Sequence, residues 1–253
     1  MPRRIGTLTA LALTAAVLAV ACARSAGAPT VVVDGTPLAT ETASPTSEPP
    51  ATPTSPPSDL DPANLEGFSY PIANECLPGL DTLMPNAPRE YRHGTHEGID
   101  WYNGAGCGPV DDSTPVLAMY EGVVIRADLD YRDVTADEVA TLEARTAEQG
   151  FTDEAALDAF RGRQVWVDHG NGIVTRYAHL SSIATGIEVG TWVTAGTRVG
   201  TVGESGTPES VSDPGTELHL HAEVRVGNSF LGKGLPPEEV RALYEHLFAP
   251  LPG

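Results

Sequence analysis

Two histidines lie two positions apart in the stretch TELHLHAEV, residues 216–224, which otherwise has the composition of a β-strand. Successive side chains of a strand point to opposite faces, so His219 and His221 share one face, roughly 6–7 Å apart. The chain has only 7 histidines, which makes a pair on one strand face a candidate for chemistry. Taken alone, an H-x-H pair is weak evidence, because such pairs are often structural.

Two other stretches supply groups of the same kind. HEGID contains His96 and Asp100, and YAHL contains His179. Imidazole and carboxylate groups suit zinc, and a catalytic zinc site uses three protein ligands and leaves a fourth position to water. Zinc makes that water a nucleophile near neutral pH, and two remaining imidazoles can transfer protons and stabilise an oxyanion. The combination therefore favours metal-dependent hydrolysis, although spacing alone allows either histidine of the pair to bind the metal.

The three stretches and their surroundings resemble the lysostaphin-type (LytM-like) zinc metalloendopeptidases, which cut peptidoglycan peptides. The matching surroundings are TPVLAMYEGVV, VDHGNGIVTRYAHLS and GTWVTAGTRVGTVGESG. The resemblance implies that His96, Asp100 and His221 bind one zinc ion per chain. It also implies that His179 and His219 act on the water and the transition state, without deciding which of them takes the proton.

The resemblance covers about residues 88–226 and has two departures. The segment that leads into and contains the histidine pair, GESGTPESVSDPGTELHLHAEV, is longer than the family's usual G-x-S-T-G-P-H-L-H-F-E. Residues 128–162 carry helix signals where two strands would otherwise be joined directly. We expect these departures to change the groove and the choice of substrate rather than the metal site.

Short β-rich runs separated by glycine turns must position these groups. The run VWVDHGNGIVTRYAHL predicts a hairpin with Asn171 and Gly172 in its turn. The predicted fold is mainly β, an antiparallel sheet or sandwich with an open groove, a helical hairpin insertion and a C-terminal helix.

The helix signals of the insertion are specific. Thr135 and Glu138 match a capping box, and Gly150 marks a helix end. A second short helix is expected to end near Gly162. Prolines at the start of 235–248 are tolerated in a first helical turn, so a third helix is expected there.

The N-terminal region has the pattern of export. Residues 1–21 combine an arginine pair, a short apolar run and small residues, as a signal peptide does. Cys22 stands where a lipoprotein signal places the acylated cysteine, and simple secretion is the alternative. Residues 22–66 are rich in Pro, Ser and Thr and predict a disordered tether. We expect a metallopeptidase domain at 67–253, held outside the cytoplasm on the membrane by a lipid anchor.

The chain has 3 cysteines, and an exported protein meets an oxidising compartment. Cys76 and Cys107 flank a turn-rich segment and are expected to form a disulfide. The odd residue, Cys22, is then accounted for by lipidation.

The formal net charge of −19 argues against nucleic acid as a partner, because phosphates would be repelled. Peptidoglycan, the membrane through the lipid anchor, and a protein activator are the expected partners. A lipoyl or biotinyl carrier domain is excluded, since its hairpin tip needs a lysine and the single lysine, Lys233, lies elsewhere. A cupin-like barrel, with Glu223 as a further ligand, is disfavoured by the HEGID and YAHL stretches.

Two functions remain open. The first is an endopeptidase that hydrolyses peptidoglycan stem peptides or cross-links through a metal-activated water. The alternative is a non-catalytic or autoinhibited cell-wall-binding regulator of other hydrolases, in which the acidic insertion holds the groove closed.

Five other residues receive structural interpretations. His93 is expected on the surface, with substrate steering as the alternative. For Arg92, a surface position and a contact with a substrate carboxylate are equally expected. Tyr177 is expected to pack, with a hydrogen bond to substrate as the alternative. His169 and His246 are expected to be structural or exposed.

Overall fold

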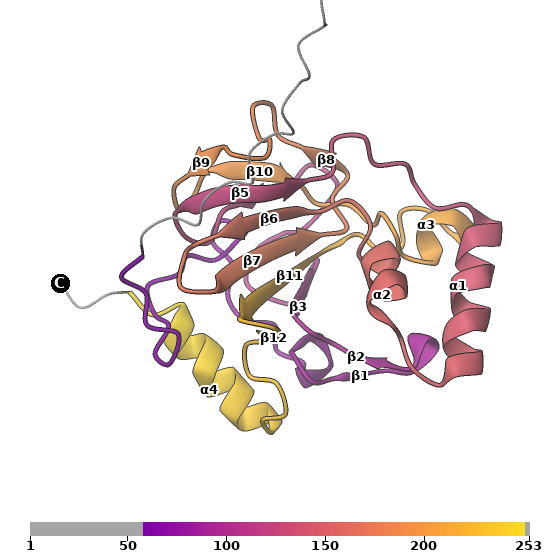
Figure 1. The fold of residues 1–253 in the computed structure, drawn as a ribbon, viewed down its shortest axis with the longest axis horizontal. Coiled ribbons are helices and arrows are strands. Elements are labelled where there is room, and N and C mark those ends of the chain that lie inside the picture. The colour runs from indigo at the N-terminus through magenta and orange to yellow at the C-terminus, as the bar shows by residue number, and fades with distance from the viewer. Residues whose placement is uncertain (1–57, 251–253) are drawn as a thin grey trace, which may run out of the picture. The chain divides into compact units, whose positions relative to one another are not determined.

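The computed structural model describes residues 58–250 (Figure 1). The expected signal peptide, the lipidated Cys22 and the tether up to residue 57 lie outside the described residues. Within the described part of the chain, no helix has the length and apolar character needed to cross a membrane.

The main sheet is antiparallel and carries the site (Figure 1). Its strand order is β12-β11-β7-β6-β5-β9, and β3 pairs with β11 as well. The bounds are β3 Ile99–Tyr102, β5 Gly122–Ala127, β6 Val165–Asp168, β7 Ile173–Ala178, β9 Trp192–Val193, β11 His219–Val226 and β12 Ser229–Phe230. The mainly β, antiparallel fold expected from the sequence is confirmed.

The β6–β7 hairpin turns through Asn171 and Gly172, which have φ of 51° and 76°. These are left-handed conformations that asparagine and glycine adopt most readily, so the turn follows from local sequence.

A second sheet has the order β4-β10-β8, and β1 and β2 form a small separate hairpin. The bounds are β1 Pro88–Arg89, β2 Gly94–Thr95, β4 Pro115–Leu117, β8 Ser182–Ile183 and β10 Arg198–Thr201. One apolar cluster joins the two larger sheets, for example through Val116 and Val199 on one and Val167 and Val224 on the other. This shared core makes the main sheet a rigid base for the site.

Helices and helical turns occupy the flanks. The bounds are η1 Asp81–Leu83, η2 Glu90–Arg92, α1 Ala136–Gln149, α2 Glu154–Arg161, α3 Glu209–Ser212 and α4 Pro237–Leu247. The C-terminal helix α4 starts with its proline in the first turn, as expected, and buries Val240, Tyr244 and Leu247 in the core.

The insertion between β5 and β6 is a helical pair, as predicted. Thr135 and Glu138 form the capping box of α1, and Gly150 ends that helix at φ 73°. Figure 1 shows α2 beside the end of β7, with α1 on its outer side. The insertion therefore stands at the edge of the sheet where His179 follows β7.

The expected boundary at residue 66 needs correction. Leu65 is buried in the core, and Asn171 donates from its side-chain amide to the carbonyls of Ser58 and Leu60. Residues 58–66 thus pack against the domain, because Leu65 brings an apolar side chain that the Pro/Ser/Thr composition of the region conceals.

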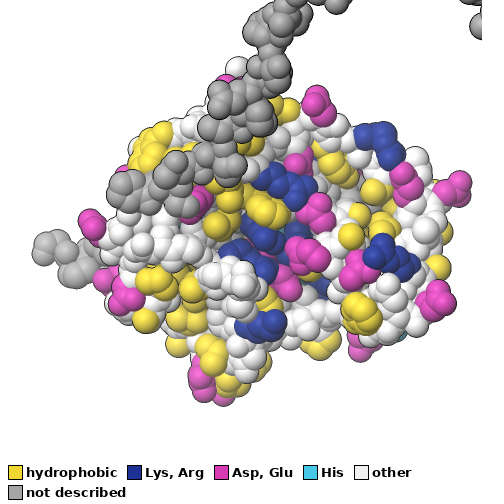
Figure 2. All heavy atoms as spheres, viewed as in Figure 1, with side chains coloured by type: hydrophobic (Ala, Val, Ile, Leu, Met, Phe, Trp, Pro, Cys, Tyr) yellow, Lys and Arg dark blue, Asp and Glu magenta, His cyan; other side chains and the backbone are white. Residues whose placement is uncertain are grey.

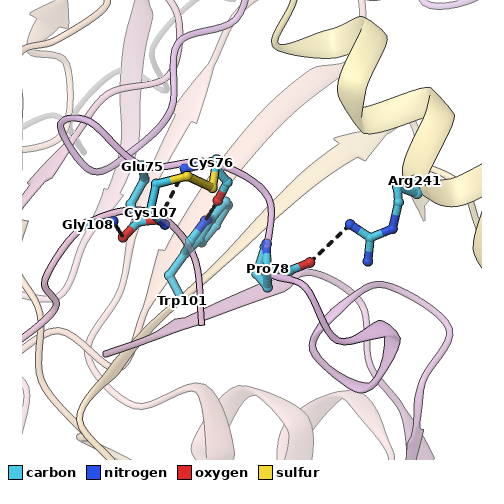
Figure 3. Close-up of a disulfide and its surroundings, with 7 residues drawn as sticks. All are labelled: Glu75, Cys76, Pro78, Trp101, Cys107, Gly108 and Arg241. Atoms are coloured by element: carbon cyan, nitrogen blue, oxygen red, sulfur yellow. Dashed lines mark hydrogen bonds between the residues drawn. A yellow bond between two sulfur atoms is a disulfide. The ribbon is translucent and has the colours of Figure 1, made fainter. Parts of the chain in front are cut away.

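Cys76 and Cys107 form a disulfide (Figure 3). Beside it, the carboxylate of Glu75 accepts the backbone N–H groups of Cys107 and Gly108 at 2.9 and 2.8 Å. The indole of Trp101 donates to the carbonyl of Cys76 at 2.9 Å and is fully buried. Because Trp101 follows Asp100 on β3, the disulfide segment helps to hold the strand that carries a candidate ligand.

Candidate active site

The register of three strands brings the candidate residues together. Antiparallel pairing sets His221 opposite Asp100 of β3 and opposite Ala178 of β7, and it sets His219 opposite Tyr102. His179 follows Ala178 directly, so β11 is the centre of the site. All five residues singled out in the sequence lie in one place.

His96 reaches the site from the segment between β2 and β3. Its backbone N–H donates to Ala87 at 2.8 Å, and its ring Nδ1 lies 2.9 Å from the carbonyl of Met84. A neutral ring in this position donates from Nδ1, which leaves the lone pair on Nε2 facing the other candidate ligands.

His96, Asp100 and His221 form a compact triad of buried donor atoms. His96 Nε2 lies 2.9 Å from Asp100 Oδ1 and 3.0 Å from His221 Nδ1, and His221 Nδ1 lies 2.7 Å from Asp100 Oδ1. When each ligand atom is about 2.1 Å from a tetrahedral zinc ion, the ligand atoms lie about 3.4 Å from one another. The three donor atoms of the triad would therefore have to move apart only slightly to hold the ion.

Each of the other two triad residues also has a hydrogen-bond partner outside the triad. The Nε2 of His221 lies 3.2 Å from Oε1 of Glu223, so His221 donates there and presents the lone pair of Nδ1 to the triad. Asp100 accepts Arg89 Nη2 on its second oxygen at 2.7 Å. No motif in the sequence singles out Arg89, and Glu223 stands out there only as a possible cupin-type ligand.

The triad favours positive charge at its centre. Burial lowers the pKa of His96 to about 4. For Asp100, burial is outweighed by His96 and His221, which hold the pKa of the carboxyl well below its usual range. For His221, burial is outweighed by Asp100 and Glu223, and the pKa is raised. Two nitrogen donors and a carboxylate around a centre that attracts positive charge fit a divalent cation.

His179 is positioned by an unusual backbone conformation and by a contact of its ring with the Ser205 carbonyl. It has φ of 57°, a left-handed conformation that is uncommon for a non-glycine residue. Its backbone N–H donates to the carbonyl of Arg161, and its ring Nδ1 lies 2.9 Å from the carbonyl of Ser205. Among residues 58–250, its Nε2 makes no hydrogen bond and faces the groove.

His219 is held in a similar way. Its Nδ1 lies 2.6 Å from the carbonyl of Glu217, and its ring stacks on Tyr102 with centroids 4.3 Å apart. The Tyr102 hydroxyl donates to the Glu217 carboxylate at 2.6 Å, so the stacking partner is itself fixed. The rings of His179 and His219 are 4.5 Å apart between centroids.

Burial lowers the pKa of His179 well below its usual value, with a further contribution from His219, and burial also lowers the pKa of His219. Both rings are therefore neutral at pH 7. A neutral imidazole whose Nδ1–H is donated to a carbonyl has its Nε2 ready to accept a proton.

The five residues open into a groove of about 440 Å³. One wall is apolar and includes Leu157 and Phe160 of α2, and Glu143 of α1 and Glu209 of α3 also line it. The insertion and the lengthened approach to β11 therefore shape the groove, as expected from the two departures in sequence.

The remaining candidates have structural surroundings. His93 and His246 are exposed, whereas His169 and Tyr177 are buried and hydrogen-bonded. Of the two positions expected for Arg92, the surface position is wrong: its side chain is buried and donates to the carbonyl of Thr95. Arg92 lines the groove, so a contact with substrate stays a prediction.

Comparison with known proteins agrees with this geometry. The model of peptidase family M23 matches residues 94–232, a range that contains all five site residues and more than half of the chain. No curated protein matches the chain.

Three solved structures are similar to the chain at low identity. A zinc-containing peptidase from Vibrio cholerae is 21% identical, with 68% of this chain and 41% of that chain covered and a TM-score of 0.41. The catalytic domain of lysostaphin from Staphylococcus simulans is 21% identical, with 53% and 69% covered and a TM-score of 0.32. A peptidase M23 protein from Pseudomonas aeruginosa is 22% identical, with 76% and 55% covered and a TM-score of 0.40. The chain thus spans less than half of the Vibrio structure. On the family match, this chain belongs to peptidase family M23.

Proposed function

We propose that this protein is a zinc-dependent endopeptidase that hydrolyses peptide bonds in peptidoglycan stem peptides or cross-links. The observation that carries the proposal is the convergence of His96, Asp100 and His221 beside two neutral imidazoles in one groove. Membership of a peptidoglycan-related peptidase family supports the substrate class.

His96, Asp100 and His221 would hold the zinc ion through Nε2, Oδ1 and Nδ1. Bound zinc would supply an acidified water and a Lewis acid for the substrate carbonyl. The ion pair of Asp100 with Arg89 keeps the second carboxylate oxygen occupied, which leaves Oδ1 for the metal.

His179 and His219 would move the protons. Each presents the lone pair of Nε2, so either accepts a proton from the attacking water. The imidazolium formed in this way becomes a donor that stabilises the tetrahedral oxyanion and can pass its proton to the leaving amine. The fixed Nδ1 contacts with Ser205 and Glu217 hold both rings in the required orientation.

The test uses the protein loaded with zinc and purified peptidoglycan. New amino termini and altered muropeptides are expected, with their loss in Asp100→Ala and His179→Ala. Zinc should be measured at one ion per chain in the parent and in His179→Ala, but not in Asp100→Ala. Absence of new termini from the zinc-loaded parent would contradict the enzyme and leave the regulator as the better account.

We also propose that the protein acts outside the cytoplasm, anchored through a lipid on Cys22. The signal-like residues 1–21 and the position of Cys22 directly after them support this. Radiolabelled fatty acid should be incorporated into the parent and not into Cys22→Ser. Equal labelling of both would overturn the anchor.

A further inference from the structure

Arg161 is the last residue of α2 and lies in a cluster of buried charges. Its side chain is almost fully buried, and it donates from Nε to Glu223 at 2.7 Å and from Nη2 to Glu97 at 2.8 Å. Figure 2 shows basic and acidic side chains intermingled in the middle of the face drawn. The insertion is thus tied into the sheet by a charged group rather than by apolar contact alone.

Glu223 links Arg161 to the triad. Its side chain is fully buried, and its Oε1 accepts both Arg161 Nε and His221 Nε2. The other oxygen, Oε2, lies 3.1 Å from Nη1 of Arg225. Because Arg161 and His221 share one oxygen, Arg161 helps to set where that oxygen stands and therefore how the His221 ring is turned.

The same helix end supports His179. The backbone carbonyl of Arg161 accepts the His179 N–H at 2.9 Å. Gly162 follows at φ 66° and packs so closely on Ser205 that a Cβ there would lie 2.0 Å from its carbonyl oxygen. His179 Nδ1 contacts the same carbonyl. The end of α2 therefore contacts both the segment that orients His179 and, through Arg161, the carboxylate beside His221.

We propose that Arg161 is a positioning residue, which acts through Glu223 to orient His221 for metal binding and so makes the inserted helix α2 part of the site. The inference rests on the proposed function for its metal, but it concerns affinity for zinc and not turnover. Partners behind a metal-bound histidine typically change metal affinity by 10–100-fold when they are lost.

Arg126 provides a matched control. It also joins the sheet to α2, through two contacts with Asp158 at 2.5 and 3.2 Å, and its side chain is partly buried. Within residues 58–250, Arg126 contacts Asp128, Asp158 and Trp166, but neither Glu223 nor the triad. Loss of Arg126 should therefore lower stability without changing the geometry of His221.

The experiment measures zinc affinity by competition with a fluorescent chelator, together with the visible spectrum of the cobalt-substituted protein. Arg161→Met should weaken zinc binding about 10–100-fold and shift the cobalt spectrum. Arg126→Met should leave both unchanged. Arg161→Lys should fall in between, because a single ammonium group cannot reproduce the forked contacts with Glu223 and Glu97.

Unchanged zinc affinity and spectrum in folded Arg161→Met, or an equal loss in Arg126→Met, would overturn the proposal. If Arg161→Met does not fold, Arg161→Lys decides in its place, and parental affinity in that variant is the contradicting result. A parent that binds neither zinc nor cobalt overturns it too. A parent that binds zinc, depends on Arg161 for affinity and cleaves no peptidoglycan would refute the proposed enzyme alone.

Discussion

The two ends of the β6–β7 hairpin each carry a histidine, and the two have different hydrogen-bond partners. His169 follows β6 at the turn, and His179 follows β7 at the open end. In both, Nδ1 lies against a backbone carbonyl, that of Glu121 for His169 and that of Ser205 for His179. The two histidines differ at the second ring nitrogen. Nε2 of His169 lies 2.9 Å from the Thr175 hydroxyl, whereas Nε2 of His179 faces the groove.

The comparison shows that burial and a lowered pKa do not identify a functional histidine. Burial lowers the pKa of His169 to about 4 and that of His179 well below its usual value. What separates them is whether the protein itself satisfies both nitrogens. A ring with one nitrogen fixed and the other open to a groove is oriented for proton transfer.

The largest expected effect is on activity. His179→Ala should lower kcat about 100- to 10,000-fold, because the imidazole that accepts or donates the proton is lost. Zinc content and the free energy of unfolding should stay near the parental values. Steady-state assays on a peptidoglycan peptide measure the change, with exposed His93→Ala as control. Retention of full activity would remove the distinction between the two hairpin ends.

The next effect is on stability. His169→Ala should lower the free energy of unfolding by about 2–4 kcal/mol, since it leaves a cavity and removes a hydrogen-bond partner from the Glu121 carbonyl and from the Thr175 hydroxyl. Activity of the folded variant should stay within about threefold of the parent. Denaturant titration and kinetics at a temperature where both proteins are folded provide the measurement. A loss of activity like that of His179→Ala would show that His169 also serves the site.

The pH dependence of stability sharpens the assignment of His169. Its pKa is about 4 in the folded protein and about 6.5 in the unfolded chain, so the unfolded chain binds more protons between these values. The contribution of neutral His169 to the free energy of unfolding is therefore complete above pH 6.5 and is lost as the pH falls toward 4. The loss is about 2 kcal/mol between pH 7 and pH 5. Glutamine does not titrate in this range. Between pH 7 and pH 5, the free energy of unfolding of His169→Gln should therefore fall by about 2 kcal/mol less than that of the parent. Identical pH profiles for the two proteins would contradict the lowered pKa.

The smallest expected effect concerns the second nitrogen of His169 itself. Thr175→Val should lower the free energy of unfolding by about 1–2 kcal/mol, because Nε2 loses its hydroxyl partner in a buried place. Activity should not change. Thermal or denaturant unfolding tests this, and a variant as stable as the parent would mean that the Nε2 contact contributes little.

Much of the fold follows from local sequence patterns. The Asn171–Gly172 turn, the Thr135 capping box and the proline start of α4 depend on neighbouring residues and lie where they were expected. The two-residue strands β1, β2, β8 and β12 and the short helix α3 were not expected. Elements this short carry no periodicity, and their pairing depends on distant segments.

The sequence predicts the residues that come together in the candidate site, but not the residues that hold them in place. The HEGID, YAHL and HLH stretches have recognisable types and spacing. Arg89, Ser205 and Arg161 have none, because a carbonyl or guanidinium gains its role only from what lies opposite it. Glu223 had one available signal: two positions after His221 on a strand, it shares a face with that histidine.

By itself, the sequence determined which side chains can do chemistry, the strand period that puts His219 and His221 on one face, and the local signals that start and end the helices. Only the tertiary structure decided which nitrogen of each histidine is free. That choice depends on hydrogen-bond partners far away in the chain, such as Met84 for His96 and Ser205 for His179. It also decided that α2 belongs to the site, because the contact of Arg161 with Glu223 joins residues 62 positions apart.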